Sequence, residues 1–183
     1  GGTSYGVQLS FTTSAPVLTA TPLTAFGANC INTTAGPNSF TINSNAVLAP
    51  NINVGPLNGY AFSTTAAGTY TASLSLTHPA GPYSQTIYVR FSPVAVQSYN
   101  GNIPVNGGGA PATSVAAAGS GVNTAPSVTS GAASAITQTT ATVAGTIPSV
   151  GCSVVTAYGI EYSTTNGFPN GTGTPVASSN LAG

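Results

Sequence analysis

The chain has 183 residues, of which 1% are charged, whereas charged residues make up about 25% of an ordinary soluble domain. It contains one Arg (Arg90), one Glu (Glu161) and one His (His78), and it lacks Asp and Lys. One Arg cannot line a phosphate backbone, and one acid cannot supply the paired carboxylates of a glycosidase. A Ser-His-Asp triad lacks its Asp, although Glu161 could replace it, and ligands for calcium or zinc are too few. We therefore predict a non-catalytic protein with no cofactor, no metal ion and no nucleic-acid partner.

The low charge does not indicate disorder, because hydrophobic residues make up 41% of the chain, with eight Tyr and six Phe. Val, Ile, Thr and aromatic residues favour strands. No apolar run reaches the roughly 18 residues of a membrane-spanning helix. The chain opens Gly1-Gly2-Thr3, without Met or a basic stretch, which indicates a mature or internal segment.

Apolar and polar residues alternate with period two, which predicts strands, and no stretch shows helical periodicity. In chain order the clearest strands are predicted at residues 39–43, 70–77, 86–91 and 158–162. Arg90 and Glu161 are expected to face outward. The residues expected to face inward are Phe40 and Ile42, then Tyr70, Ala72, Leu74 and Leu76, then Ile87, Val89 and Phe91, and finally Tyr158, Ile160 and Tyr162. Short strands with frequent turn signals predict an all-β protein built from antiparallel β-sandwiches.

A change of composition near residues 106–126 divides the chain. Residues 106–111 predict a hairpin loop, residues 113–118 a last strand, and residues 119–126 a short linker between domains. We place one sandwich at residues 15–122 and a second at residues 123–183. The second is short, because a seven-stranded sandwich needs roughly 100 residues.

The first domain resembles an Ig-like repeat of secreted surface proteins of Bacteroidota. The resemblance is carried by segments in a characteristic order: Pro16–Pro22 (PVLTATP), Ser39–Ile42 (SFTI), Tyr60–Thr64 (YAFST), Thr86–Pro93 (TIYVRFSP) and Ser98–Ile103 (SYNGNI). The second domain resembles the fibronectin-III-like repeat of the same proteins, through Ala135–Val143 (AITQTTATV), Thr156–Thr164 (TAYGIEYST) and Gly167–Thr174 (GFPNGTGT). The resemblance implies tandem Ig-like and fibronectin-III-like sandwiches, incomplete at the C-terminal end.

Residues 1–14 resemble the last strand of another fibronectin-III-like repeat, with alternating Tyr5, Val7, Leu9 and Phe11. Two interpretations follow. In one, the chain is a window of a longer alternating array. In the other, residues 1–14 complete the open sandwich of a neighbouring subunit by strand addition.

The two cysteines, Cys30 and Cys152, lie in connections that an Ig-type arrangement brings toward the joint between the domains. A disulfide there would suit an oxidising exterior. Unpaired or differently paired thiols remain the alternative. Two sequons, at Asn32 and Asn170, match the N-glycosylation pattern, which also occurs often by chance.

The remaining distinctive side chains favour structural roles. His78 is expected in a solvated turn, Arg90 is expected to be solvated or stacked on a Tyr, and Tyr99 resembles a tyrosine-corner position.

The resemblance implies a structural repeat of an extracellular filament or giant cell-surface adhesin of the type IX secretion cargo class. Its partners would be neighbouring repeats or copies of itself. The alternatives are a module that binds polysaccharide or another glycan through Tyr and amide side chains, and a spacer in a secreted multidomain enzyme.

Overall fold

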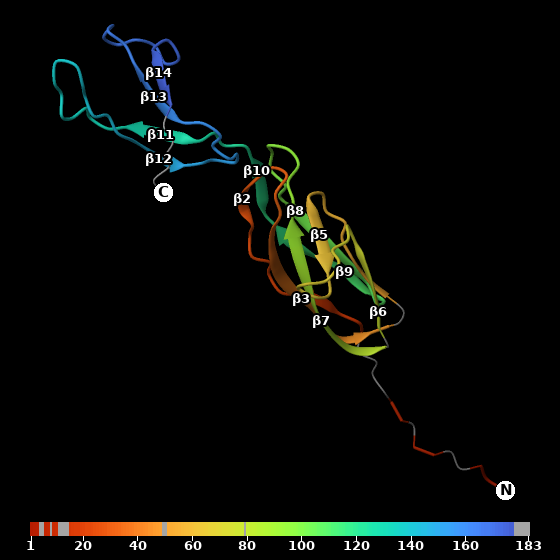
Figure 1. The fold of residues 1–183 in the computed structure, drawn as a ribbon. Coiled ribbons are helices and arrows are strands. Elements are labelled where there is room, and N and C mark those ends of the chain that lie inside the picture. Colours follow the sequence, from red (N-terminus) through yellow and green to blue (C-terminus); the bar gives the residue numbers. More distant parts are fainter. Residues whose placement is uncertain (4–5, 8, 11–14, 49–50, 79, 178–183) are drawn as a thin grey trace. The chain divides into compact units, whose positions relative to one another are not determined.

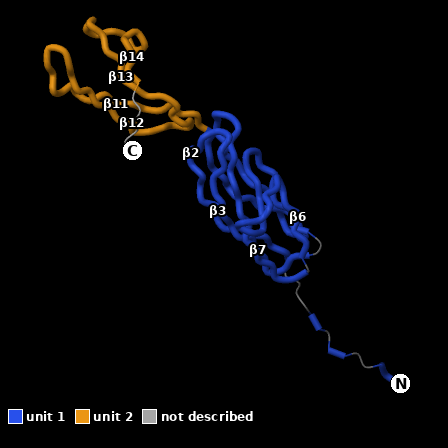
Figure 2. Tube along the Cα trace, in the orientation of Figure 1, with its two compact units in different colours: residues 1–121 blue, residues 122–183 orange. Residues whose placement is uncertain are grey.

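The computed structural model describes residues 1–3, 6–7, 9–10, 15–48, 51–78 and 80–177. Within these ranges the chain forms strands and no helix, so the prediction of an all-β protein is confirmed. No helix in the described part is long and apolar enough to cross a membrane. The chain divides into two compact units, Gly1–Gly121 and Val122–Gly183 (Figure 2).

The first unit is a β-sandwich of two four-stranded antiparallel sheets (Figure 1). One sheet has the order β1-β3-β7-β5, the other has the order β6-β4-β8-β9, and β10 pairs with β2 beside them. The strands are β1 (Leu18–Ala20), β2 (Gly27–Cys30), β3 (Ala35–Val47), β4 (Asn51–Val54), β5 (Tyr60–Ser63), β6 (Leu74–Thr77), β7 (Gly81–Phe91), β8 (Gly101–Gly107), β9 (Ala110–Ala117) and β10 (Gly119–Val122).

The two sheets of this unit enclose a single apolar core. Alternate residues of each strand face inward, because successive side chains of a strand point to opposite faces. The inward residues belong to one buried cluster: Leu18, Phe40, Ile42, Val47, Ile52, Val54, Tyr60, Phe62, Leu76, Ile87, Val89, Phe91, Tyr99, Ile103, Val105, Val115 and Ala117. The predicted inward faces at residues 39–43 and 86–91 are therefore confirmed.

The predicted strand at residues 70–77 is shorter than expected, since β6 begins at Leu74. Ala72 is exposed and Tyr70 only half-buried. Thr71 instead forms an isolated bridge with Phe62, with backbone bonds in both directions of 2.8 and 2.9 Å. The alternation of apolar and polar residues thus begins at Tyr70, four residues before the strand itself starts at Leu74.

The predicted linker at residues 119–126 is wrong for its first half, because residues 119–122 form strand β10. The Gly119 carbonyl accepts a hydrogen bond of 2.9 Å from the Tyr99 N–H, and the Gly121 N–H donates one of 2.9 Å to the Gln97 carbonyl. A Cβ on Gly121 would collide with the Ala95 carbonyl oxygen. The glycines of this stretch therefore serve close packing and not flexibility.

The loop predicted at residues 106–111 is the β8–β9 hairpin. Gly107, Gly108 and Gly109 have φ angles of 120°, 61° and 70°, which are costly for residues with a side chain. The triple glycine therefore fits the backbone that this turn requires.

The second unit contains two separate two-stranded antiparallel sheets. They are formed by β11 (Ser127–Ser130) with β12 (Gly145–Ser149), and by β13 (Gly159–Tyr162) with β14 (Thr174–Ala177). None of residues 122–177 is buried. The inward face predicted at residues 158–162 is therefore not closed, as Ile160 is 36% and Tyr162 58% exposed.

Candidate functional site

The β13–β14 pair of the second unit presents one uncovered apolar face. Ile160 pairs with Val176 and Tyr162 with Thr174. Directly paired residues project to the same face of a sheet. Val176 is 54% exposed, although an apolar face of this kind is normally buried in a sandwich.

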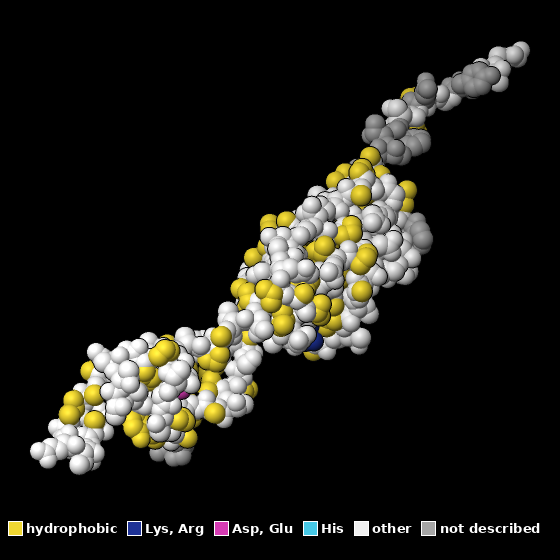
Figure 3. Space-filling model, turned by 90° about the horizontal axis from the view of Figure 1, so that it is seen from above, with side chains coloured by type: hydrophobic (Ala, Val, Ile, Leu, Met, Phe, Trp, Pro, Cys, Tyr) yellow, Lys and Arg dark blue, Asp and Glu magenta, His cyan; other side chains and the backbone are white. Residues whose placement is uncertain are grey.

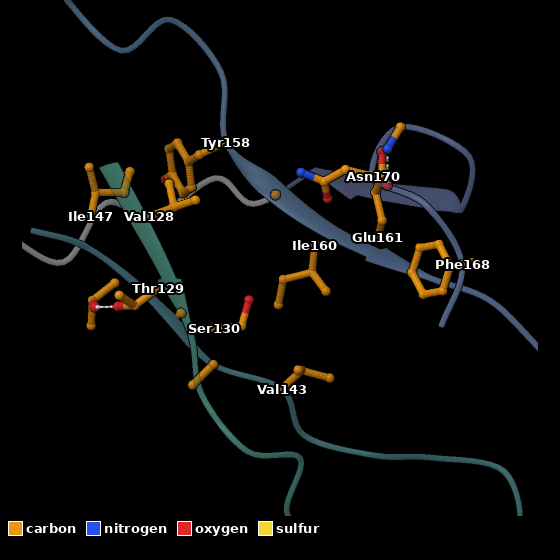
Figure 4. Close-up of a pocket in the computed structure, with 15 residues that line it drawn as sticks. Val128, Thr129, Ser130, Val143, Ile147, Tyr158, Ile160, Glu161, Phe168 and Asn170 are labelled. Atoms are coloured by element: carbon orange, nitrogen blue, oxygen red, sulfur yellow. Dashed lines mark hydrogen bonds between the residues drawn. The ribbon is translucent and has the colours of Figure 1, made fainter. Parts of the chain in front are cut away.

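A cleft of about 690 Å³ lies between the two strand pairs of this unit. Ile160 points from β13 into this space, in the direction of Val143 and Ser130 (Figure 4). The cleft is lined by Val128, Thr129, Ser130, Val143, Ala144, Gly145, Thr146, Ile147, Tyr158, Gly159, Ile160, Glu161, Phe168, Asn170 and Gly171. Its walls are thus a mixture of aliphatic, aromatic and neutral hydrogen-bonding groups.

Glu161 is the one carboxylate among the lining residues, and it is already engaged. Its Oε2 accepts a hydrogen bond of 2.8 Å from the Gly171 N–H, which ties β13 to the loop before β14 (Figure 4). Across β11 and β12, the hydroxyls of Thr129 and Thr146 lie 2.6 Å apart. No group of three or more His, Cys, Asp or Glu side chains occurs in the described ranges. The cleft therefore suits an uncharged, partly apolar occupant.

The segment predicted to exchange between subunits lies at the start of the chain. Val7 is 90% exposed and Leu9 is 87% exposed. Tyr5 and Phe11 lie outside the described residues. The described part of the chain thus leaves both aliphatic side chains of this segment uncovered.

The two cysteines belong to different units. Cys30 ends β2, and Cys152 follows β12. The Cys152 N–H donates a hydrogen bond of 2.8 Å to the Thr124 carbonyl, and its Sγ lies 3.4 Å from the Thr124 hydroxyl oxygen. Their disulfide remains a prediction.

Both sequon asparagines are exposed in loops. Asn32 has a φ of 62° in the turn between β2 and β3, and its N–H donates to the Pro93 carbonyl at 2.7 Å. Asn170 lies between β13 and β14 and lines the cleft. Their glycosylation remains a prediction.

Arg90 is half-buried, and its guanidinium carbon lies 4.2 Å from the ring centroid of Tyr70. This stacking realises one of the two expected arrangements. Sequence reasoning did not identify Tyr70 as the partner, because the alternation pattern assigned it to an inward face. A cation over an aromatic ring in a partly solvated place is worth about 0.5–1 kcal/mol.

His78 is not solvated as expected, since it is 6% exposed directly after β6. Its ring centroid lies 4.8 Å from that of Tyr83 on β7. The packing of the two rings buries His78 in the first unit. It is therefore a structural position.

Tyr99 has the geometry of a tyrosine corner. Its hydroxyl oxygen accepts hydrogen bonds of 3.0 Å from the backbone N–H groups of Val94 and Ala95. Burial raises the pKa of the phenol, but the hydrogen bonds from Val94, Gln97 and Ala95 outweigh this effect and leave the pKa lowered. Such donors stabilise the ionised form. Tyr99 therefore holds the loop at residues 94–99 in place just before β8 begins.

The surface of the described chain is nearly free of charged side chains (Figure 3). Comparison with known proteins adds no relative, because no family model and no curated protein matches the chain.

Proposed function

We propose that the chain is a structural repeat segment of an extracellular filament or giant cell-surface adhesin, without catalytic activity. It would mediate surface attachment or the association of cells with each other or with a matrix. The proposal places residues 15–122 as an Ig-like sandwich and residues 123–183 as an incomplete fibronectin-III-like one. Its partners would be neighbouring repeats or copies of itself.

The observation that carries this proposal is the near-absence of charged side chains from a protein with a well-packed sandwich. One Arg and one Glu give a formal net charge of zero. Copies of such a protein meet without long-range repulsion, and a net charge near zero promotes association. That property is a liability for a protein that works alone and an advantage for one that assembles.

Two further features support the assignment. The Tyr99 hydroxyl reaches back to the backbone at residues 94 and 95, as in the tyrosine corner of Ig-like sandwiches. The described residues of the second unit form two pairs of strands, whereas a complete sandwich has about seven strands. Strand pairs without a buried core suit a domain that is closed by contact with a neighbouring repeat or copy.

The test is immunogold electron microscopy with an antibody raised against residues 1–183. We expect gold along filaments on intact cells, and loss of the signal when protease is added from outside. Antibody pre-adsorbed with the purified chain serves as the control. Gold confined to the cell interior would contradict the proposal. Antigen present outside the cell only as dispersed monomer would also contradict it and would favour the spacer function.

Carbohydrate binding is the second candidate, favoured by the aromatic side chains of the second unit. Tyr158 and Phe168 line the cleft, and Tyr162 is 58% exposed. Aromatic faces of this kind can stack on sugar rings. A glycan array probed with the chain and with its Tyr162→Ala variant decides: binding that the substitution abolishes supports this function, and no binding to any glycan removes it.

A further inference from the structure

The second unit leaves its apolar residues in water, in contrast to the closed core of the first. The exposed fractions are 72% for Val128, 43% for Val143, 36% for Ile160, 58% for Tyr162 and 54% for Val176. Contiguous apolar surface on a folded protein usually marks a site of interaction. The two sheets of a sandwich stabilise each other by covering such faces, and in the second unit the described residues give each sheet two strands.

Among the described residues β13 pairs with β14 alone, so its other edge is available to a further strand. β14 contains Pro175, which pairs with Glu161 and has no N–H to donate. Hydrogen-bonded and non-bonded pairs alternate in an antiparallel ladder. Because Pro175 would leave a hydrogen-bonded pair without one of its two bonds, we assign Glu161–Pro175 to the non-bonded class. The N–H and C=O of Glu161 then face the opposite edge of β13. Because β13 contains no proline, this edge can pair with an added strand along its whole length.

The first residues of the chain match this edge. The sequence alternates Tyr5, Val7, Leu9 and Phe11 with small or neutral residues, and the segment has neither charge nor proline before Pro16. Ten extended residues span about 33 Å, which exceeds the length of the four-residue β13. Val7 and Leu9 are 90% and 87% exposed, so the single chain leaves them available to another copy.

We propose that the cleft of the second unit accepts residues 1–14 of a second copy of this chain as an added strand along the outer edge of β13. Val7 and Leu9 of the incoming copy then stand beside Ile160 on the same side of the sheet and extend the apolar face that Ile160 and Val176 present. This inference rests on the proposed assembly function and identifies its contact. Association by an added strand combines backbone hydrogen bonds with side chains seated on one face.

The first experiment measures self-association of the full chain by sedimentation equilibrium. We expect a concentration-dependent association that the double variant Val7→Asp/Leu9→Asp weakens at least tenfold. The matched control is Val94→Asp/Val96→Asp, which introduces the same charge at side chains of the first unit that are 70% and 65% exposed. Equal association of the Val7→Asp/Leu9→Asp variant and the native chain, or a chain that stays monomeric at every concentration, would overturn the proposal.

The second experiment identifies the acceptor with a fluorescent peptide of residues 1–14. The full-length Val7→Asp/Leu9→Asp chain, whose own segment is disabled, should bind the peptide saturably, and the further substitution Ile160→Asp should reduce binding at least tenfold. NMR shift changes on adding the peptide should map to residues 159–162, which keeps the test valid if the Ile160→Asp chain misfolds. Absence of binding, or shift changes confined to the first unit, would overturn the proposal.

These results are independent of the test of function. Filaments labelled on cells, together with undiminished association of the Val7→Asp/Leu9→Asp chain, would support the filament function and rule out the proposed strand contact. Specific peptide binding at β13 without any surface filament would do the reverse.

Discussion

The hydroxyl oxygen of Tyr99 lies 3.0 Å from the backbone nitrogen of Val94, and this bond fixes the loop that precedes β8. A second bond of the same length comes from the Ala95 N–H. Tyr99 is 5% exposed, and its ring also packs on Phe91 at a centroid distance of 5.4 Å. The residue thus has a polar and an apolar role that a single substitution can separate.

Tyr99→Phe keeps the ring and removes the acceptor, leaving two part-buried N–H groups without it. We expect the free energy of unfolding to fall by about 2 kcal/mol, measured by urea denaturation. Tyr70→Phe is the control, because the Tyr70 hydroxyl donates to the Ala66 carbonyl in an exposed place, and its loss should cost less than about 0.5 kcal/mol. Equal effects of the two substitutions would contradict the corner role.

Tyr60→Phe should change the free energy of unfolding in the opposite direction and raise it. Tyr60 is 4% exposed, and its hydroxyl has no hydrogen-bond partner among the described residues. Removing a buried polar group that lacks a partner should stabilise the first unit by about 1 kcal/mol. Tyr162→Phe, at a ring that is 58% exposed, should leave stability unchanged. A loss of stability in Tyr60→Phe would show that the hydroxyl is bonded.

Alkaline pH should destabilise the first unit through the hydroxyls of Tyr60 and Tyr83. Burial raises the pKa values of Tyr60 and Tyr83 above 10.0, the ordinary value for tyrosine. The folded state therefore holds these protons more tightly than the unfolded state. Their contribution to stability is complete below pH 10 and is lost as the pH rises through the raised values. Urea denaturation at pH 9 and at pH 11 should show this loss, smaller in Tyr60→Phe; the lowered pKa of Tyr99 acts in the opposite direction.

Gly121→Ala tests whether β10 is a packed strand. The added Cβ would meet the Ala95 carbonyl oxygen and lie 2.9 Å from the Pro93 Cβ. Overpacking of this kind should cost about 2 kcal/mol. Gly6→Ala is the control, since a Cβ there meets nothing within 4 Å. A neutral Gly121→Ala would indicate that residues 119–122 yield easily, as a linker would.

The predicted bond between Cys30 and Cys152 can be tested on the intact mass. The native chain should be lighter than the reduced chain by two hydrogen masses, and proteolysis without reductant should release one cross-linked peptide that contains both residues. Cys30→Ser should abolish the cross-linked peptide. Identical native and reduced masses would leave both thiols unbonded and remove the prediction.

The strands of the first unit were predictable because each buries one face, which makes apolar and polar residues alternate with a period of two. Ile87, Val89 and Phe91 alternate with polar or amphipathic residues, and all three are fully buried. Residues 119–121 defeated the same reasoning. Their glycines are selected by the close approach of Phe91, Ala95 and Pro93, and a glycine chosen for space looks in sequence like one chosen for flexibility.

The open cleft was only partly predictable. The short length of the second domain indicated an incomplete sandwich, and the alternation at residues 158–162 placed Ile160 and Tyr162 on a common face. What the sequence could not supply is the pairing of β13 with β14. This register places Pro175 opposite Glu161 and leaves the other edge of β13 without a partner among the described residues. It could not be predicted because it depends on contacts between residues that are distant in the chain.

The lack of any buried residue between 122 and 177 has a consequence for the distribution of stability along the chain. Amide protons exchange with solvent deuterium at rates set by local opening, and opening costs little where few apolar contacts must be broken. The amides of β3 and β7, which lie over the closed core, should exchange only on global unfolding. Those of β13 and β14 should exchange orders of magnitude faster, so one polypeptide combines a durable module with one whose protection depends on what covers it.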